Sequence, residues 1–371
     1  MKNLIFPVII IIAVLSACTK DDEYAISDFV GSDTLSICFN DGSVSIGDLP
    51  YFVSVSTNGA HVTVNSYTSK FLVLRLIGAT DNGSLLVFSN KKFGLELCGV
   101  RILNPQGPAI NNQCGKSLYV TMADGTENEL TDGETYAVAP VSATGDTLSQ
   151  KGVLFSEGQI YFRGDGELTV RGNARNGIAS DDYITFESGV VNVFMAPTAT
   201  NGVKANDGVF ISGGTLNIDV KGNGARGIKN DARMEISGGQ TSITTSGDCK
   251  IELVDGVPDT TSCAGIKCDS LMCMTAGVLN ITSTGDGGKG INASQAIEFR
   301  GGTLDVQALG TEEVGKPKAV KSDVAIEISG GSFHALSYRS RACDNAGSNT
   351  PTIIGTPREQ SLNKKEVTVK F

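Results

Sequence analysis

The sequence predicts an all-β chain that winds into a parallel β-helix, a solenoid with coils of about 25 residues. Three observations predict this fold. A motif repeats in register through the second half of the chain, apolar residues alternate with polar ones, and no helical pattern of ten or more residues follows the first apolar segment. Alternation with a period of two is typical of strands, because successive side chains point to opposite faces.

The repeat begins in each copy at a small residue, which we call the anchor. Successive anchors are separated by 25, 25, 38, 25 and 29 residues, and a second Gly lies twelve residues after every anchor. A unit this short cannot bury its apolar face alone, whereas stacked units form interior aliphatic ladders. We therefore expect three short strands per coil and a triangular cross-section. The anchors are Gly177, Gly202, Gly227, Gly265, Gly290 and Ala319.

The predicted core lies one, seven, nine and sixteen residues after each anchor. In the copy that begins at Gly202 these positions hold Val203, Val209, Ile211 and Ile218. The corresponding positions of the other copies are also apolar, so the stacked coils are expected to share four interior ladders.

The chain is predicted to begin with a signal peptide over residues 1–17 and an acidic tether over residues 18–34. The apolar stretch 4–15 is short for a membrane span and ends in "LSAC". This ending resembles a bacterial lipobox, in which Cys18 is lipidated; an ordinary signal peptide is the alternative. The following "TKDDEY" resembles an acidic export signal, with a solvated linker as the alternative. We expect an outer-membrane lipoprotein exposed at the cell surface.

The remainder is predicted to form one solenoid, with no second independent domain. The parallel β-helix is expected over residues 35–337, with irregular N-terminal coils over 35–172 and regular repeats over 173–337. Residues 338–371 are rich in Asn, Gly and Pro, end in "EVTVKF", and are predicted to form a C-terminal cap. A solenoid needs caps because its terminal coils expose strand edges.

Composition excludes some classes of function. The chain has 40 acidic and 30 Lys or Arg residues and a formal net charge of −10, which argues against nucleic acid as a partner. It has two His residues, far apart, and no C-x-x-C motif, which argues against zinc. Trp is absent, and this weakens an aromatic platform for neutral sugars and favours ionic recognition.

Four stretches, in order, carry a resemblance to a known family. They are "GPAINNQCGKSLYVTMADGTENELTDG", "GVLFSEGQIYFRGDGELTVRGN", "NGIASDDYITFESG" and "GVKANDGVFISGG". They resemble the calcium-associated carbohydrate-binding β-helix family, over roughly residues 35–337. The resemblance implies a right-handed, polysaccharide-lyase-like β-helix that is extracellular and binds plant-type polysaccharide. Catalytic activity is not established for that group, so a non-catalytic role is expected.

A polar row follows the anchors at four residues' distance. Stacking would place its members about 5 Å apart, and Asp and Asn oxygens are ligands that calcium prefers. The family's "SKDD"-like segment corresponds to Ser180, Asp181 and Asp182, without the Lys. The alternative is that these residues only turn the chain. The predicted ligands of a calcium cofactor are Asp181, Asp182, Asn206, Asp207, Asn230, Asp231, Asp269 and Asp323.

A Lys row lies two residues after the anchors. One interpretation is that it binds uronate carboxylates of an acidic polysaccharide, with calcium bridging Asp and uronate. A second is that Lys and Asp neutralise each other on a solvated wall. A third is that one Lys abstracts a proton, as in a calcium-dependent pectate-type lyase. The predicted carbohydrate-binding residues are Lys204, Lys229, Lys267 and Lys321.

The long step between anchors comes from an insertion at residues 248–265. Cys249 and Cys263 bracket it and could form a disulfide that closes a loop of about fifteen residues. The insertion could roof a binding groove or be a tolerated surface loop.

The sequence therefore predicts calcium-assisted, non-catalytic binding of an extracellular acidic polysaccharide at the bacterial cell surface. A neighbouring glycan-uptake system is an expected partner. The alternatives are the lyase and a structural or adhesive solenoid.

Overall fold

The computed structural model describes residues 32–142, 145–312 and 314–371. The predicted signal peptide, lipidation at Cys18 and nearly all of the tether lie outside these residues. No helix in the described part of the chain is long and apolar enough to cross a membrane.

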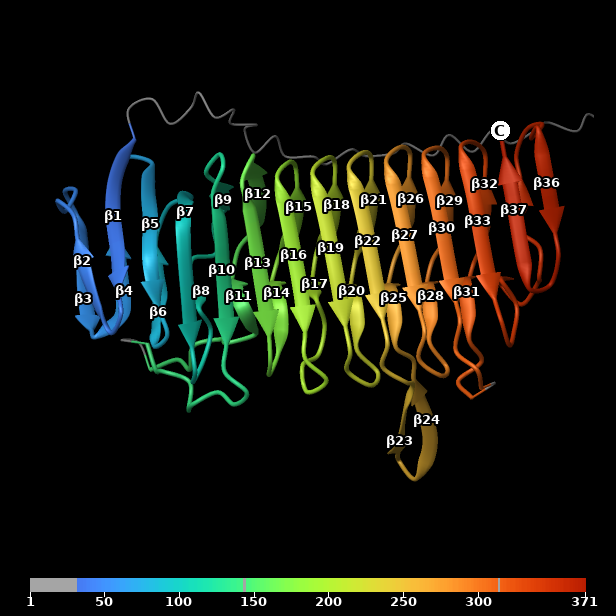
Figure 1. Cartoon of the computed structure of the whole chain (residues 1–371), viewed down its shortest axis with the longest axis horizontal. Coiled ribbons are helices and arrows are strands. Elements are labelled where there is room, and N and C mark those ends of the chain that lie inside the picture. The colour runs from blue at the N-terminus through green and yellow to red at the C-terminus, as the bar shows by residue number, and fades with distance from the viewer. Residues whose placement is uncertain (1–31, 143–144, 313) are drawn as a thin grey trace, which may run out of the picture.

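The described chain is an elongated right-handed parallel β-helix, as predicted, with coils of roughly 25 residues stacked along one axis (Figure 1). Three parallel ladders run along it and give the triangular cross-section. The first ladder is a 12-stranded sheet in which β3 and β4 form an antiparallel hairpin and the other pairs are parallel. Its strands are β3 (Val53–Asn58), β4 (Ala60–Ser66), β6 (Gly83–Ser89), β8 (Ile110–Asn112), β11 (Gly152–Ser156), β14 (Asn176–Ser180), β17 (Val203–Ala205), β20 (Arg226–Asn230), β25 (Ala264–Cys268), β28 (Lys289–Ala293), β31 (Lys318–Ser322) and β34 (Cys343–Asn345).

The second and third ladders belong to one 23-stranded sheet, because the long β7 pairs with β9 through its first half and with β10 through its second. The second ladder contains β9 (Leu118–Met122), β12 (Ile160–Gly164), β15 (Tyr183–Phe186), β18 (Gly208–Ile211), β21 (Arg233–Ile236), β26 (Met272–Met274), β29 (Ile297–Phe299), β32 (Ile326–Ile328) and β35 (Thr352–Ile353). The third contains β1 (Asp33–Asn40), β5 (Leu72–Thr80), β7 (Phe93–Asn104), β10 (Glu127–Asp132), β13 (Glu167–Gly172), β16 (Val190–Met195), β19 (Thr215–Val220), β22 (Gln240–Thr245), β27 (Val278–Ser283), β30 (Thr303–Ala308) and β33 (Ser332–Ser337).

Antiparallel strands close both ends of the solenoid. At the N-terminal end, β2 (Ser43–Ile46) pairs antiparallel with β1. At the C-terminal end, β37 (Glu366–Lys370) pairs antiparallel with β33 and with β36 (Glu359–Leu362), and its Val367 and Val369 are buried. These strands occupy edges that would otherwise template pairing with another chain.

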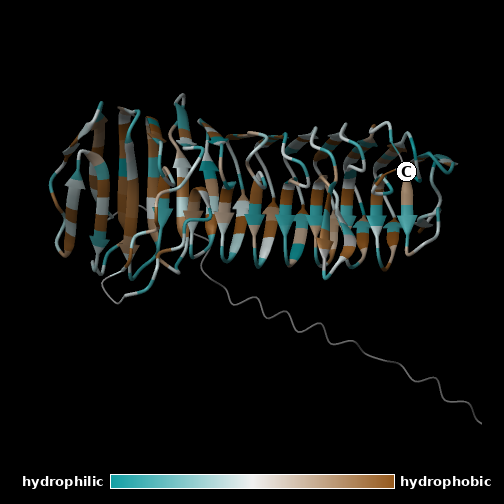
Figure 2. Ribbon diagram, turned by 90° about the horizontal axis from the view of Figure 1, so that it is seen from below, coloured by the Kyte–Doolittle hydropathy of each residue, from teal (hydrophilic) through white to brown (hydrophobic). Residues whose placement is uncertain are grey.

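The predicted interior ladders are confirmed. The residues just after the anchors pair in register from coil to coil and are fully buried, as Ile178, Val203 and Ile228 illustrate. Phe162 and Phe186 stack in the same core with ring centroids 5.0 Å apart. Figure 2 shows apolar and hydrophilic segments alternating along the stacked strands. The alternation of apolar and polar residues in the sequence therefore predicted correctly which side chains face the core and which face outward.

The anchors are small because each faces a bulky core residue sixteen positions later. A methyl group built on an anchor Gly would lie between 2.0 and 2.7 Å from that residue, in pairs that run from Gly177 and Val193 to Gly290 and Val306. Ala319 is the exception, and the residue sixteen positions after it is Ala335. Both alanines are fully buried. The exception therefore follows from volume compensation in the core.

The insertion forms a projecting hairpin of β23 (Lys250–Val254) and β24 (Val257–Thr261), which leaves the solenoid on one side (Figure 1). Cys249 and Cys263 are free thiols, so the structure contradicts the predicted disulfide. The hairpin register pairs Lys250 with Thr261, which sets Cys249 opposite Ser262 instead. Cys263 Sγ donates to the Gly222 carbonyl at 3.8 Å, and Cys249 Sγ packs against Gly287.

Candidate functional site

The predicted Lys row forms one line on the outer face of the 12-stranded sheet. Lys204 pairs in register with Lys229, and Lys229 with Lys267; Lys321 follows after Asn292. All four side chains are partly exposed. The row arises because the position two residues after the anchor points outward in each coil.

The Asp row pairs with this Lys row. Asp231 accepts from both Lys204 and Lys229, the second contact being 2.9 Å. Lys267 pairs with Asp269, and Lys321 with Asp323. Partial burial pushes the pKa of Asp231 upward, but hydrogen bonds and charge from Lys204 and Lys229 outweigh this and hold it below its usual value. All four predicted sugar-binding lysines are therefore already paired with predicted metal ligands.

Asn230 was predicted as a metal ligand, but it does not lie on the outer wall, the face that carries the Lys and Asp rows. Its side chain is fully buried, donates to the carbonyls of Ala232 and Arg233 at 3.0 and 2.8 Å, and accepts from the Ala232 amide. It lies in register with Ala205 and Cys268, on the inner side of the corner. Asn230 therefore satisfies the backbone of a turn and faces away from any external ion.

Asp182 and Asp207 lie one residue further along two consecutive coils. Asp182 accepts a hydrogen bond from Gln159 and another, at 2.9 Å, from the amide of Tyr183. The Asp207 amide donates to the Asp182 carbonyl at 3.2 Å, and the Asp207 side chain is exposed.

Across the described ranges, no cluster of three or more His, Cys, Asp or Glu side chains is arranged to hold a metal ion.

A cavity of about 500 Å³ lies over the outer wall at β14 and β17. Asp181, Asn206 and Asp231 line it together with the ammonium groups of Lys151 and Lys204. Lys151 contacts Asp181 at 2.6 Å, and the Asn206 amide donates to Asp181 at 3.4 Å. This is the one place where the structure brings several predicted metal ligands and a predicted sugar ligand into one described cavity.

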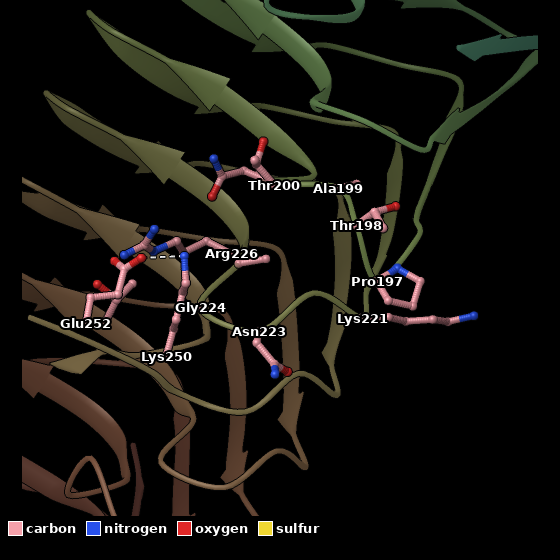
Figure 3. Close-up of a pocket in the computed structure, with 13 residues that line it drawn as sticks. Pro197, Thr198, Ala199, Thr200, Lys221, Asn223, Gly224, Arg226, Lys250 and Glu252 are labelled. Carbon is pink, nitrogen blue, oxygen red and sulfur yellow. Dashed lines mark ion pairs between the residues drawn. The ribbon is translucent and has the colours of Figure 1, made fainter. Parts of the chain in front are cut away.

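A neighbouring cavity of about 670 Å³ is walled by the β23–β24 hairpin (Figure 3). Lys250, Glu252 and Thr261 of the hairpin line it together with Arg226 and Asn223 of the solenoid. Lys250 pairs with Glu252, close to Arg226 (Figure 3). Thr200 lines both cavities, so they are adjacent on the same side of the solenoid. The insertion thus builds one wall of a groove beside the Lys row.

A second cationic row, which the sequence analysis missed, begins the strands of the same sheet. Arg226, Lys289 and Lys318 occupy the position before the anchor in three coils. Burial lowers the pKa of each, and for Lys289 the value falls to about 8, with further contributions from the charges of Lys321 and Lys318. The sequence does contain a pattern that would have predicted this row, because a Lys or Arg directly precedes the anchor in these three copies.

Aromatic side chains form a row on the second ladder. Tyr119 and Tyr161 stack with centroids 4.9 Å apart, Tyr161 meets Tyr183 edge-on, and Tyr183 meets Phe210 edge-on. The Arg163 guanidinium lies 4.3 Å from the centre of the Tyr119 ring. These rings pack mainly against one another. Tyr338 is more than half exposed but does not belong to this row. The aromatic row is thus a packed layer on the second ladder, separate from the Lys row of the 12-stranded sheet.

Comparison with known proteins agrees with the fold. A protein of Acetivibrio thermocellus (strain ATCC 27405), described as "Carbohydrate-binding domain-containing protein", is 32% identical over 120 residues, which cover 31% of this chain and 40% of that protein. The match thus spans well under half of the relative's length. A solved structure, "Structure of the polysaccharide lyase-like protein from C. thermocellum, Gadolinium derivative", is similar with a TM-score of 0.56 and 24% identity over 71% of this chain and 96% of that one. At that identity the likeness shows the fold.

The family comparison covers most of the described solenoid. A family described as "Carbohydrate-binding domain-containing protein" matches residues 58–249 and 223–315, which together exceed half of the chain. The chain belongs to this family of carbohydrate-binding domain-containing proteins.

Proposed function

We propose that the protein binds an acidic polysaccharide along the outer face of the 12-stranded sheet, without transforming it. The observation that carries the proposal is the second cationic row, Arg226, Lys289 and Lys318, which adds positive charge to a face whose Lys row is already paired with Asp, in a chain whose formal net charge is −10. Cations concentrated on one face of an acidic protein attract an anionic polymer to that face. Adjacent coils repeat at about 4.8 Å, so an extended glycan lying along the solenoid axis would meet a cation in several coils.

The proposed setting is the surface of a bacterial cell, where a lipid on Cys18 would hold the protein beside glycan-uptake machinery. That anchoring is proposed from the "LSAC" sequence alone.

Polygalacturonate is expected to retard the protein in affinity electrophoresis, whereas its fully methyl-esterified form and neutral glucans are not. Esterification removes the carboxylate charge but keeps the sugar, so it isolates the ionic contribution. Raising the ionic strength should weaken the retardation, because exposed charges are screened. Equal retardation by the esterified and free acids would contradict the ionic mode.

The same preparation decides between the three classes of function. A new ultraviolet absorbance from unsaturated uronate would establish the lyase and contradict non-catalytic binding. Failure to bind any member of a broad glycan array, with or without a chelator, would leave the structural or adhesive solenoid.

We propose calcium assistance at one place, the cavity lined by Asp181, Asn206 and Asp231. These residues supply carboxylate and amide oxygens, which suit calcium. The ammonium groups of Lys151 and Lys204 now occupy those oxygens, so an ion would have to take their place. A uronate carboxylate would help, because it gives the displaced ammonium groups a new partner.

Calcium is accordingly expected to raise the melting temperature by a few degrees when oligogalacturonate is present, and by less when it is absent, since a ligand stabilises the state that binds it. Asp181→Asn should remove the calcium-dependent rise. Asp269→Asn, which also breaks a Lys–Asp pair but lies outside this cavity, should keep it. Identical melting of the unaltered protein in calcium and in chelator, with the glycan present, would exclude calcium assistance.

A further inference from the structure

A third cavity lies at the C-terminal end of the solenoid, over β28, β31 and β34 of the 12-stranded sheet. Its volume is about 820 Å³. The lining includes six cationic side chains, which are Lys289, Lys316, Lys318, Lys321, Arg341 and Lys364. Two carboxylates, Asp323 and Asp344, also line it. The excess is therefore four positive charges, six minus two.

This balance differs from that of the outer wall, where Lys and Asp alternate. Here Lys321 is paired with Asp323, and Arg341 with Asp344 at 3.3 Å. Lys316 and Lys364 are exposed, and neither has an ion pair with a carboxylate in the described ranges. The cavity is consequently a concentration of positive charge in an acidic protein.

Lys289 and Lys318 both donate to neutral oxygens, and Lys318 is also close to one carboxylate. Lys318 Nζ donates to Ser340 Oγ at 2.6 Å and lies 4.0 Å from Asp344, with a side chain that is 8% exposed. Lys289 Nζ donates to Ser262 Oγ and to the Gly315 carbonyl at 3.3 Å. Hydroxyl and carbonyl groups orient an ammonium group without cancelling its charge. Removing a cation from water costs free energy that an anion would offset.

We propose that this cavity is an anion site that holds a carboxylate or sulfate group of the bound glycan through direct Lys and Arg contacts, without a divalent cation. The inference rests on the proposed function and names one subsite of it. Lys321 is the last member of the Lys row, so a glycan lying along that row would bring an acidic group into the cavity. A guanidinium and several ammonium groups can satisfy either oxyanion with charge-assisted hydrogen bonds.

The low pKa of Lys289 agrees with this arrangement. Burial is its largest cause, followed by repulsion from Lys321 and Lys318; the charge of Arg226 adds to the lowering and Cys249 opposes it. A bound anion would relieve the repulsion and raise the pKa of Lys289 again.

The test uses exposed residues so that folding is preserved. In Lys316→Gln/Lys364→Gln, affinity for an oligogalacturonate measured by calorimetry should fall about fivefold to thirtyfold, the combined effect of two partly exposed charge contacts. The matched control, Lys116→Gln/Lys365→Gln, removes the same charge from exposed residues that do not line the cavity, and should stay within about twofold of the unaltered protein. Equal losses in the two double variants would overturn the anion site.

Chelator and pH give two further readouts. The affinity difference between Lys316→Gln/Lys364→Gln and its control should persist in chelator, and its disappearance there would overturn the direct contact. Between pH 7 and pH 9 affinity should fall, because Lys289 loses its proton through a pKa of about 8; Lys289→Gln should flatten that decline. A decline that is unchanged in Lys289→Gln would assign the effect to other groups and count against the site.

The outcomes separate this site from the wider proposal. A sulfated galactan oligosaccharide, tested beside the uronate, shows which oxyanion the cavity prefers. If polygalacturonate binds but the lysine variants behave as their control, the anion site fails and the proposed function stands. If the unaltered protein binds no acidic glycan, the proposed function itself fails.

Discussion

Gly290→Ala is expected to lower the free energy of unfolding by about 3 kcal/mol, measured by urea denaturation. A methyl group at Gly290 would lie 2.0 Å from Val306 Cγ1 and 2.5 Å from the carbonyl oxygen of Ala319. Neither neighbour can move freely, because both belong to strands that pair with coils on either side. Overpacking of this kind forces backbone shifts in a close-packed interior.

Adding Val306→Ala to Gly290→Ala should recover part of the loss, although Val306→Ala alone is destabilising because it leaves a cavity. The double-mutant cycle should give an interaction energy of about 1–2 kcal/mol, in the favourable sense. The last regular coil already carries this combination as Ala319 and Ala335. Strictly additive effects would show that the methyl group at Gly290 does not meet Val306.

Asn230→Ala is expected to cost about 3 kcal/mol of unfolding free energy, with the same value in calcium and in chelator. The side chain satisfies two carbonyls and one amide at a buried corner, and removing it leaves these groups without a partner. Asn230→Ser should cost roughly half as much. Ser occupies the equivalent position in other coils, where Ser322 Oγ accepts from the amides of Val324 and Ala325 at 3.1 and 2.9 Å.

Calorimetry and urea denaturation of these two variants would also test the metal hypothesis at this residue. A loss that appears only in the presence of calcium would restore Asn230 as an ion ligand and contradict its inward orientation.

Much of the fold follows from short-range pattern. Residues such as Val203 and Ile211 repeat at strand spacing in every copy, and the anchors keep those copies in register. A repeated unit has only one way to bury the same apolar positions in successive coils, so the parallel stack was predictable. The free thiols of Cys249 and Cys263 were not, since a one-residue offset in a hairpin decides which side chains face each other.

The sequence predicted which side chains of the candidate site line up from coil to coil, but not which of them form ion pairs. The spacing from the anchor placed Lys204, Lys229 and Lys267 in one line, and the structure has that line. The sequence does not tell which cations keep their charge unpaired. Asp231 neutralises two lysines of neighbouring coils, whereas Lys289 donates to the Ser262 hydroxyl and the Gly315 carbonyl, more than twenty positions away, and has no carboxylate partner in the described ranges.

The sequence by itself determined the all-β solenoid, its coil length and its interior ladders, because strand periodicity and a repeat in register are local properties of the chain. Only the tertiary structure decided that Asn230 turns inward while Asp231 turns outward, and that positive charge collects over β28, β31 and β34. The physical reason is that corner direction and charge balance depend on contacts between stacked coils, which no single coil encodes.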